Sequence, residues 1–81
     1  LLSGFGYAEP VYIAPQMEIS FIVPVYNEVG NVDPLIHELQ ETGARLNRSF
    51  EMVIVDDGST DGTVQRLKFW AAELPNLRVV V

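Results

Sequence analysis

The hydrophobic positions of the chain form two patterns, which are short continuous runs and longer segments with helical spacing. The runs EISFIVPV at residues 18–25 and EMVIVD at residues 51–56 are rich in Ile and Val. Such nearly unbroken runs are typical of strands buried on both faces of a parallel sheet. A third run, NLRVVV at residues 76–81, predicts another strand. Pro24 lacks an N–H, so we expect it at the end of the first strand.

Two segments with helical periodicity separate these runs. A loop, YNEVGN, precedes the first segment, where Asn31 or Asp33 can cap a helix with Pro34 in its first turn. Gly43 is expected to weaken this helix near its end. The apolar stripe of the first segment comprises Val32, Leu35, Ile36, Leu39 and Leu46, and that of the second comprises Val64, Leu67, Ala71 and Leu74, with Trp70 beside them. The second helix should end before Pro75.

The order β-α-β-α-β implies parallel strands joined by right-handed crossovers. We therefore predict an α/β fold for residues 18–81, a three-stranded Rossmann-like half of a doubly wound sheet with strand order 3-2-1. Residues 1–17 contain a single charged residue and are interpreted as an irregular or extended arm. An exposed apolar edge is a template for pairing with another chain. The first strand should lie at such an edge, which predicts self-association through this edge or through the arm.

Composition excludes several classes of function. The chain has 81 residues, 48% of them hydrophobic, and a formal net charge of -6. This charge argues against nucleic-acid binding, which needs Lys and Arg to neutralise phosphates, and against a polybasic membrane surface. No apolar run approaches the roughly 20 residues of a membrane span, so we expect the chain itself to be soluble. The absence of cysteine excludes thiolate chemistry, and the only histidine, His37, is expected on the solvent side of the first helix.

Two loops with unusual chemistry, PVYNE and VDDGST, follow the first two predicted strands. Ligands of parallel α/β sheets bind outside the carboxyl ends of the strands, so we expect both loops in one site. Tyr26 offers a flat face for stacking a base, and Glu28 offers an acceptor for a base imide or a ribose hydroxyl. A turn followed by a helix cap, with Tyr26 half packed, is the plainer alternative for the first loop.

The second loop begins with two adjacent carboxylates, Asp56 and Asp57. Gly58 then permits a tight turn, and residues 59–61 (Ser, Thr, Asp) can cap the second helix. Two exposed acids and a helix cap remain an alternative to a binding role. A calcium loop starting at Asp57 is excluded, because its twelfth position is Lys68 where a bidentate Glu is required.

The sequence resembles the N-terminus of inverting nucleotide-sugar glycosyltransferases of family 2, which have the GT-A fold. The resemblance lies in two stretches, ISFIVPVYNEVGNVDPLIHEL and FEMVIVDDGSTDGTVQRL. The sequence looks most like the polyprenyl- or dolichyl-phosphate sugar synthases. The resemblance covers about residues 18–81 and implies that they form the nucleotide-binding part of a truncated GT-A domain. The implied nucleotide contacts are Pro24, Tyr26 and Glu28 from the first loop and Val55 and Asp57 from the second. Asp57 is the strongest of these candidates, while Asp56 supports the turn.

The resemblance also implies an activity and partners. The full-length enzyme would transfer a sugar from a UDP- or GDP-sugar to a polyprenyl phosphate or a glycan, at the cytoplasmic face of a membrane. The Asp-x-Asp motif that holds Mg²⁺ or Mn²⁺ and the general base lie beyond the third strand in that family. We therefore expect no catalytic residue and no metal site in this chain, and no transferase activity from it alone.

Two other classes of function stay open at this point. A receiver-like signalling domain also places paired acids at a strand end to bind Mg²⁺. In such a domain the pair follows the first strand and an acceptor Asp ends the third, whereas here the pair follows the second strand and RVVV ends without Asp. The chain could also be a self-associating module that binds no ligand.

Overall fold

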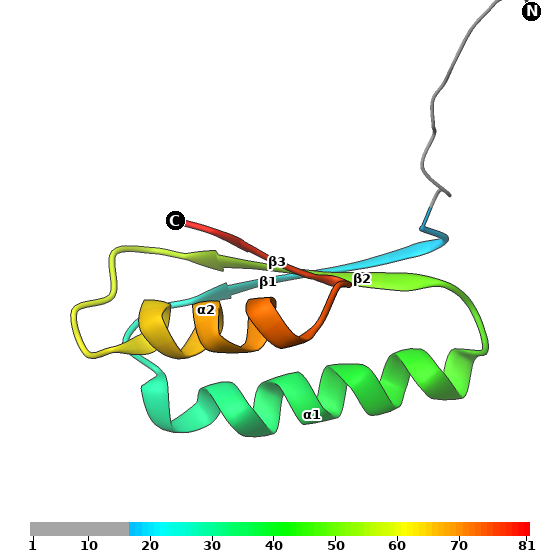
Figure 1. The fold of residues 1–81 in the computed structure, drawn as a ribbon, viewed down its shortest axis with the longest axis horizontal. Helices are drawn as coiled ribbons and strands as arrows, with labels where there is room; N and C mark the ends of the chain where they lie inside the picture. The colour runs from blue at the N-terminus through cyan, green and yellow to red at the C-terminus, as the bar shows by residue number, and fades with distance from the viewer. Residues whose placement is uncertain (1–16) are drawn as a thin grey trace, which may run out of the picture.

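The computed structural model describes residues 17–81, so the predicted arm at residues 1–17 lies, apart from Met17, outside the described residues. The elements are β1 (Ile19–Val25), α1 (Val29–Leu46), β2 (Phe50–Asp56), α2 (Thr63–Glu73) and β3 (Leu77–Val80). The three strands are parallel in one sheet of order β1-β2-β3 (Figure 1). The predicted three-stranded α/β fold is confirmed, and strand order 3-2-1 is the same order counted from the other edge. Neither helix of the described part is long and apolar enough to cross a membrane.

Both helices lie on one side of the sheet (Figure 1). This arrangement follows from two crossovers of the same hand that step in the same direction across the sheet. The core lies between the sheet and the helices, and its buried members are Val25, Val32, Ile36, Met52, Ile54, Leu67 and Leu77.

The expectation that the first strand is buried on both faces is wrong. Along β1 the exposure alternates, with Phe21 and Val23 packed against the core while Ile22 keeps 67% of its surface exposed. The reason is that the helices cover only one face of the sheet, so every second side chain of an outer strand faces away from them. The prediction holds better for β2, which lies between the other two strands and buries Met52, Val53 and Ile54 in succession.

The first helix begins earlier than its sequence predicts. It starts at Val29, not near Asn31 or Asp33, and Pro34 is its sixth residue instead of lying in the first turn. Glu28 occupies the N-cap position without a side-chain cap of its own. The early start is supported by Asp61, which accepts the N–H of Val29, and by Thr63, whose hydroxyl accepts the N–H of Glu28. Both acceptors are distant in sequence, so local cap signals could not reveal where the helix begins.

Gly43 contributes to packing as well as to helix propensity. It is buried in α1, and the ring of Phe50, the first residue of β2, lies over it. A Cβ at this position would lie 2.5 Å from Phe50 Cδ1 and Cζ. Phe50 also meets the ring of Phe21 edge-on, with 5.8 Å between centroids. The glycine therefore lets the end of α1 approach the beginning of β2.

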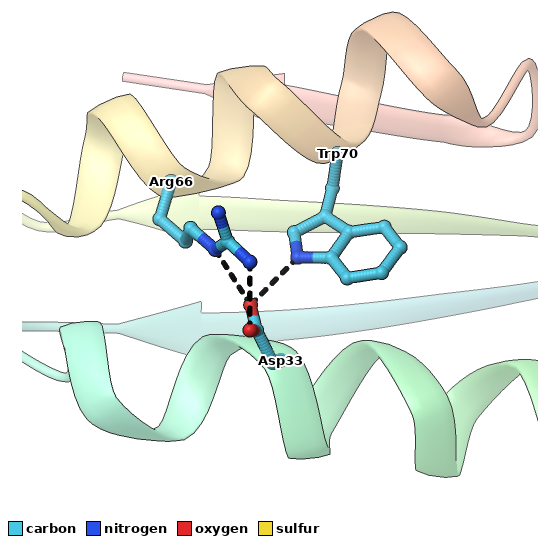
Figure 2. A network of polar contacts seen from close by, with 3 residues as sticks. All are labelled: Asp33, Arg66 and Trp70. Atoms are coloured by element: carbon cyan, nitrogen blue, oxygen red, sulfur yellow. Dashed lines mark hydrogen bonds and ion pairs between the residues drawn. The ribbon is translucent and has the colours of Figure 1, made fainter.

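A polar cluster of three side chains joins the two helices (Figure 2). Asp33 of α1 accepts hydrogen bonds from Arg66 Nε and Nη2 and from Trp70 Nε1 of α2, each at 2.8 Å. The two Arg66 bonds, followed by the Trp70 bond, lower the pKa of Asp33 to about 2. His37 is exposed, as predicted, although its ring also meets Trp70 edge-on at 5.6 Å between centroids. Asp33 is thus a link between helices and not the cap of one.

Candidate functional site

The loop after β1 (residues 26–28) and the loop after β2 (residues 57–62) meet at one edge of the sheet. The register pairs Val25 with Asp56, the last residues of the two strands. The Asp57 N–H donates to the carbonyl of Val25 at 3.0 Å, which extends the pairing one residue into the second loop. The predicted meeting of the two loops is therefore present in the structure.

The paired acids have different surroundings. Asp56 is 6% exposed, and its Oδ2 accepts the N–H groups of Gly58 at 3.1 Å and Ser59 at 2.9 Å. The Ser59 hydroxyl donates to Asp56 Oδ1, and this bond is the main cause that lowers the pKa of Asp56, ahead of the two N–H groups. Asp57 is exposed. Asp56 thus closes the turn, as expected, and leaves Asp57 as the carboxylate that faces solvent.

Asn27 connects the first loop to the second. Its N–H donates to Ser59 Oγ at 2.8 Å, and its Oδ1 accepts from the Thr60 N–H at 2.8 Å. The backbone of Asn27 has φ 49°, in the left-handed region that Asn tolerates better than most residues. Both partners lie more than 30 residues away in the sequence, so local patterns do not reveal this connection.

The beginnings of the two helices share one carboxylate. Asp61 Oδ2 accepts the N–H of Val29, the first residue of α1, at 3.2 Å, while Oδ1 accepts the N–H of Thr63, the first residue of α2, at 3.0 Å. Thr63 is fully buried, and its hydroxyl donates to Asp61 Oδ1 and accepts the Glu28 N–H at 2.9 Å. The Thr63 hydroxyl is the main cause that lowers the pKa of Asp61, followed by the N–H groups of Val29 and Thr63.

These contacts correct the predicted cap of the second helix. The N-cap position is held by Gly62, with φ 98° and no side chain to accept a bond, and not by residues 59–61. Asp61 still accepts a helix N–H, but it does so for both helices. Thr63 was missed altogether, since a buried hydroxyl at the first turn of a helix has no local signature that distinguishes it from an ordinary cap.

The side chains proposed for nucleotide contact fall into two groups. Tyr26 is 55% exposed, and Glu28 and Asp57 are also exposed, so all three present their side chains to solvent at the junction of the loops. Pro24 and Val55 are register partners in neighbouring strands, just before the loops. A pocket of about 280 Å³ along the β1 edge is lined by Pro24 and Glu28 but by none of the other three. Tyr26 and Asp57 are thus exposed and do not line this pocket, and the nucleotide-contact roles stay a prediction.

The structure offers few groups for a metal ion at this surface. Among residues 17–81, no three His, Asp or Glu side chains are grouped so that they could hold one. Asp56 and Asp61 already accept several hydrogen bonds each. The larger pocket, of about 600 Å³, lies between the helices beside His37 and Trp70, and none of the candidate site residues lines it.

Residues 20–81 match the family model of glycosyl transferase family 2. The chain belongs to this family. The predicted family is thus confirmed, and membership removes the receiver-like alternative. A dodecaprenyl-phosphate galacturonate synthase of Rhizobium johnstonii is 37% identical over 76 residues, which are 93% of this chain and 22% of that protein. An undecaprenyl-phosphate 4-deoxy-4-formamido-L-arabinose transferase of Pseudomonas aeruginosa is 39% identical over 62 residues, which are 76% of this chain and 18% of that protein.

A solved structure shows a similar arrangement of elements. It is a mannosyltransferase from Pyrobaculum calidifontis in complex with GDP-Man and Mn²⁺, which superposes on this family 2 chain with a TM-score of 0.60 and 29% identity. The match covers 89% of this chain and 22% of the mannosyltransferase. The chain therefore spans about a fifth of the length of the relatives and the solved structure that it matches.

Proposed function

We propose that this chain is the nucleotide-recognition part of a glycosyltransferase that transfers a sugar from a UDP- or GDP-sugar to a polyprenyl phosphate. The observation that carries the proposal is the junction of the two loops, which the hydrogen bond from the Asp57 N–H to the Val25 carbonyl holds together. Tyr26, Glu28 and Asp57 are all exposed at this junction. The names of the two relatives, a dodecaprenyl-phosphate synthase and an undecaprenyl-phosphate transferase, support the lipid acceptor. The GDP-Man in the mannosyltransferase supports the donor class.

The proposed contacts follow from the chemistry of the base. Uracil and guanine both carry a ring N–H that a carboxylate can accept, which suits Asp57. Tyr26 would stack on the base, and Glu28 would accept a ribose hydroxyl. Pro24 and Val55 would supply an apolar contact at the strand ends. Charge-assisted hydrogen bonds of this kind are about twice as strong as neutral ones, so Asp57 should contribute most to selection of the base.

The diphosphate needs help from outside these loops. Helix N-termini commonly bind phosphate through free N–H groups, but here the first N–H of each helix already donates to Asp61. The chain also carries a net charge of -6. We therefore propose that Mg²⁺ or Mn²⁺ neutralises the diphosphate in the full-length enzyme, held by residues outside this chain, and Mn²⁺ in the mannosyltransferase complex supports this. A metal would also stabilise the departing diphosphate. We expect weak nucleotide binding and no sugar transfer from this chain alone.

A titration followed by ¹⁵N NMR tests the proposal on the 81-residue chain. With UDP or GDP, we expect the largest shift changes at the amides of Tyr26, Glu28 and Asp57, and little change at the opposite end of the sheet. Asp57→Asn should weaken binding, whereas Glu73→Gln, which neutralises another exposed acid at the far end of α2, should not. Shifts that avoid both loops, or equal effects of the two substitutions, would contradict the proposed site.

We also propose that the chain self-associates through the open edge of β1. Within residues 17–81, β1 pairs only with β2, so its other edge has free backbone donors and acceptors. Ile22, in the middle of this strand, is 67% exposed. Light scattering over a range of concentrations should show a growing average mass for the unmodified chain. A constant monomer mass at the highest concentration would rule the association out.

A further inference from the structure

Four hydrogen bonds join the first loop and the start of α1 to the second loop and the start of α2, and each pairs a backbone N–H on one side with a side-chain oxygen on the other. The side chains that accept them belong to Asn27, Ser59, Asp61 and Thr63, and we call these four residues the latch. None of the latch side chains is among those proposed to contact the nucleotide. The bonds span between 32 and 35 residues of sequence.

We propose that the latch positions the nucleotide-contact residues, and that affinity for the nucleotide depends on it. Asn27 lies between Tyr26 and Glu28 in the chain, and the N–H of Glu28 is itself held by Thr63. Asp57 lies on the other loop, tied to the first through the carbonyl of Val25. The latch therefore fixes the distance between the stacking ring, the ribose acceptor and the base acceptor. The inference rests on the proposed function for the identity of the ligand.

Hydrogen bonds, not apolar packing, must set this geometry. Tyr26, Asn27 and Glu28 are all exposed, as are Thr60 and Asp61, so little apolar surface is buried between the loops. The exception is the fully buried Thr63, whose hydroxyl joins both helix beginnings by bonding Glu28 N–H and Asp61. Loss of this hydroxyl would leave the N–H of Glu28 without its acceptor and would leave Asp61 Oδ1 with only the N–H of Thr63. Thr63 is thus the central positioning residue.

The sharpest perturbation is Thr63→Val, which keeps the shape of the side chain and removes only the hydroxyl. Thr63→Ser restores the hydroxyl and should rescue the effect. Asp33→Asn is the matched control, because it weakens a different set of bonds between the same two helices, away from the loops. A second latch variant is Asn27→Gly, and Asn47→Gly is its matched control. Both asparagines have left-handed φ, 49° and 55°, but Asn47 lies at the far end of α1.

Two measurements separate positioning from stability. In the ligand-free chain, Thr63→Val should speed amide hydrogen exchange at Glu28 and Val29 about tenfold, which corresponds to the loss of one ordinary hydrogen bond. In NMR titrations with UDP and GDP, the same variant should bind about three- to tenfold more weakly. Thr63→Ser should return both values close to those of the unmodified chain. Asp33→Asn should leave loop exchange and affinity unchanged while lowering the unfolding midpoint.

The exchange and affinity results together decide whether the latch positions the nucleotide-contact residues. Faster exchange in Thr63→Val with unchanged affinity would overturn the positioning role, as would an equal loss of affinity in Asp33→Asn or in Asn47→Gly. If the unmodified chain shows no response to either nucleotide, the proposed function of the chain fails by itself. The latch is then judged on the ligand-free chain, where faster exchange at residues 27–29 in Thr63→Val supports it and unchanged exchange overturns it.

Discussion

Gly43→Ala should destabilise the chain, although alanine is the better helix former. In a helix interior the replacement of glycine by alanine stabilises by about 1 kcal/mol. At this position the new Cβ would meet two ring carbons of Phe50 at 2.5 Å, whereas carbon atoms are at their best separation near 3.5–4.0 Å. The ring would have to move by about 1 Å, and Phe21 packs against it edge-on.

The magnitude follows from these opposing effects. Overpacking in a well-packed region costs about 1–3 kcal/mol, and subtraction of the gain in helix propensity leaves a net loss of about 0–2 kcal/mol. For a domain of this size, 1 kcal/mol shifts the unfolding midpoint by about 4–8 °C. We therefore expect Gly43→Ala to lower the midpoint by several degrees, measured by thermal or urea unfolding followed by circular dichroism.

Gly30→Ala provides the matched control in the same helix. A Cβ at Gly30 would meet nothing within 4 Å, and the residue is the second of α1. This variant should be neutral or stabilising by up to about 1 kcal/mol. The double variant Gly43→Ala with Phe50→Leu should lose less stability than the sum of its single changes, because the smaller side chain relieves the overlap. If Gly43→Ala raised the midpoint as much as Gly30→Ala does, the close approach of Phe50 would be refuted.

The remaining predictions concern pH, the base and the open edge. Because the pKa of Asp33 is lowered from 3.8 to about 2, its contribution to stability is present above pH 3.8 and is lost as pH falls towards 2. Acid unfolding of Asp33→Asn should therefore be less steep in this range, and an unchanged slope would contradict the link to Arg66. UDP should bind about tenfold more tightly than CDP, since cytosine has no ring N–H for Asp57, and Asp57→Asn should reduce this preference. Equal titration curves for the two nucleotides would exclude Asp57 as the base acceptor. Ile22→Lys should abolish self-association in light scattering, because a charged side chain at a sheet edge opposes pairing; an unchanged average mass would place the contact elsewhere.

Much of the fold was predictable because its signals are local. The continuous apolar runs locate all three strands, and Pro75 lies just after the last helix as expected. The meeting of the two loops followed from topology alone, since parallel strands end at the same edge. The resemblance implied that Asp56 supports the turn, and its bonds to the N–H groups of Gly58 and Ser59 agree with this. The nucleotide contact of Asp57 stays a prediction.

The errors arise where distant residues decide local structure. The start of α1 depends on Asp61 and Thr63, which lie more than 30 residues away, so the nearby asparagine and aspartate gave a misleading cap signal. Gly43 was interpreted by helix propensity, although the ring of Phe50 determines its role. The exposure of Ile22 follows from both helices lying on one side of the sheet, a consequence of strand order that the buried-strand pattern did not convey.

The pairing of β1 with β2 also determines whether the loops can meet at all. A slip of two residues between these strands would return every side chain to its own face of the sheet, because the pleat repeats every two residues. The alternation of buried and exposed side chains therefore does not exclude such an error, but the slip would separate the two loops by about 6.6 Å along the strands. The hydrogen bonds that join Asn27 to Ser59 and Thr60, and Glu28 to Thr63, could then not form. The bonds of the loop junction thus stabilise only the native register of β1 and β2. Any ligand that binds only the correctly aligned chain will increase the population of that register.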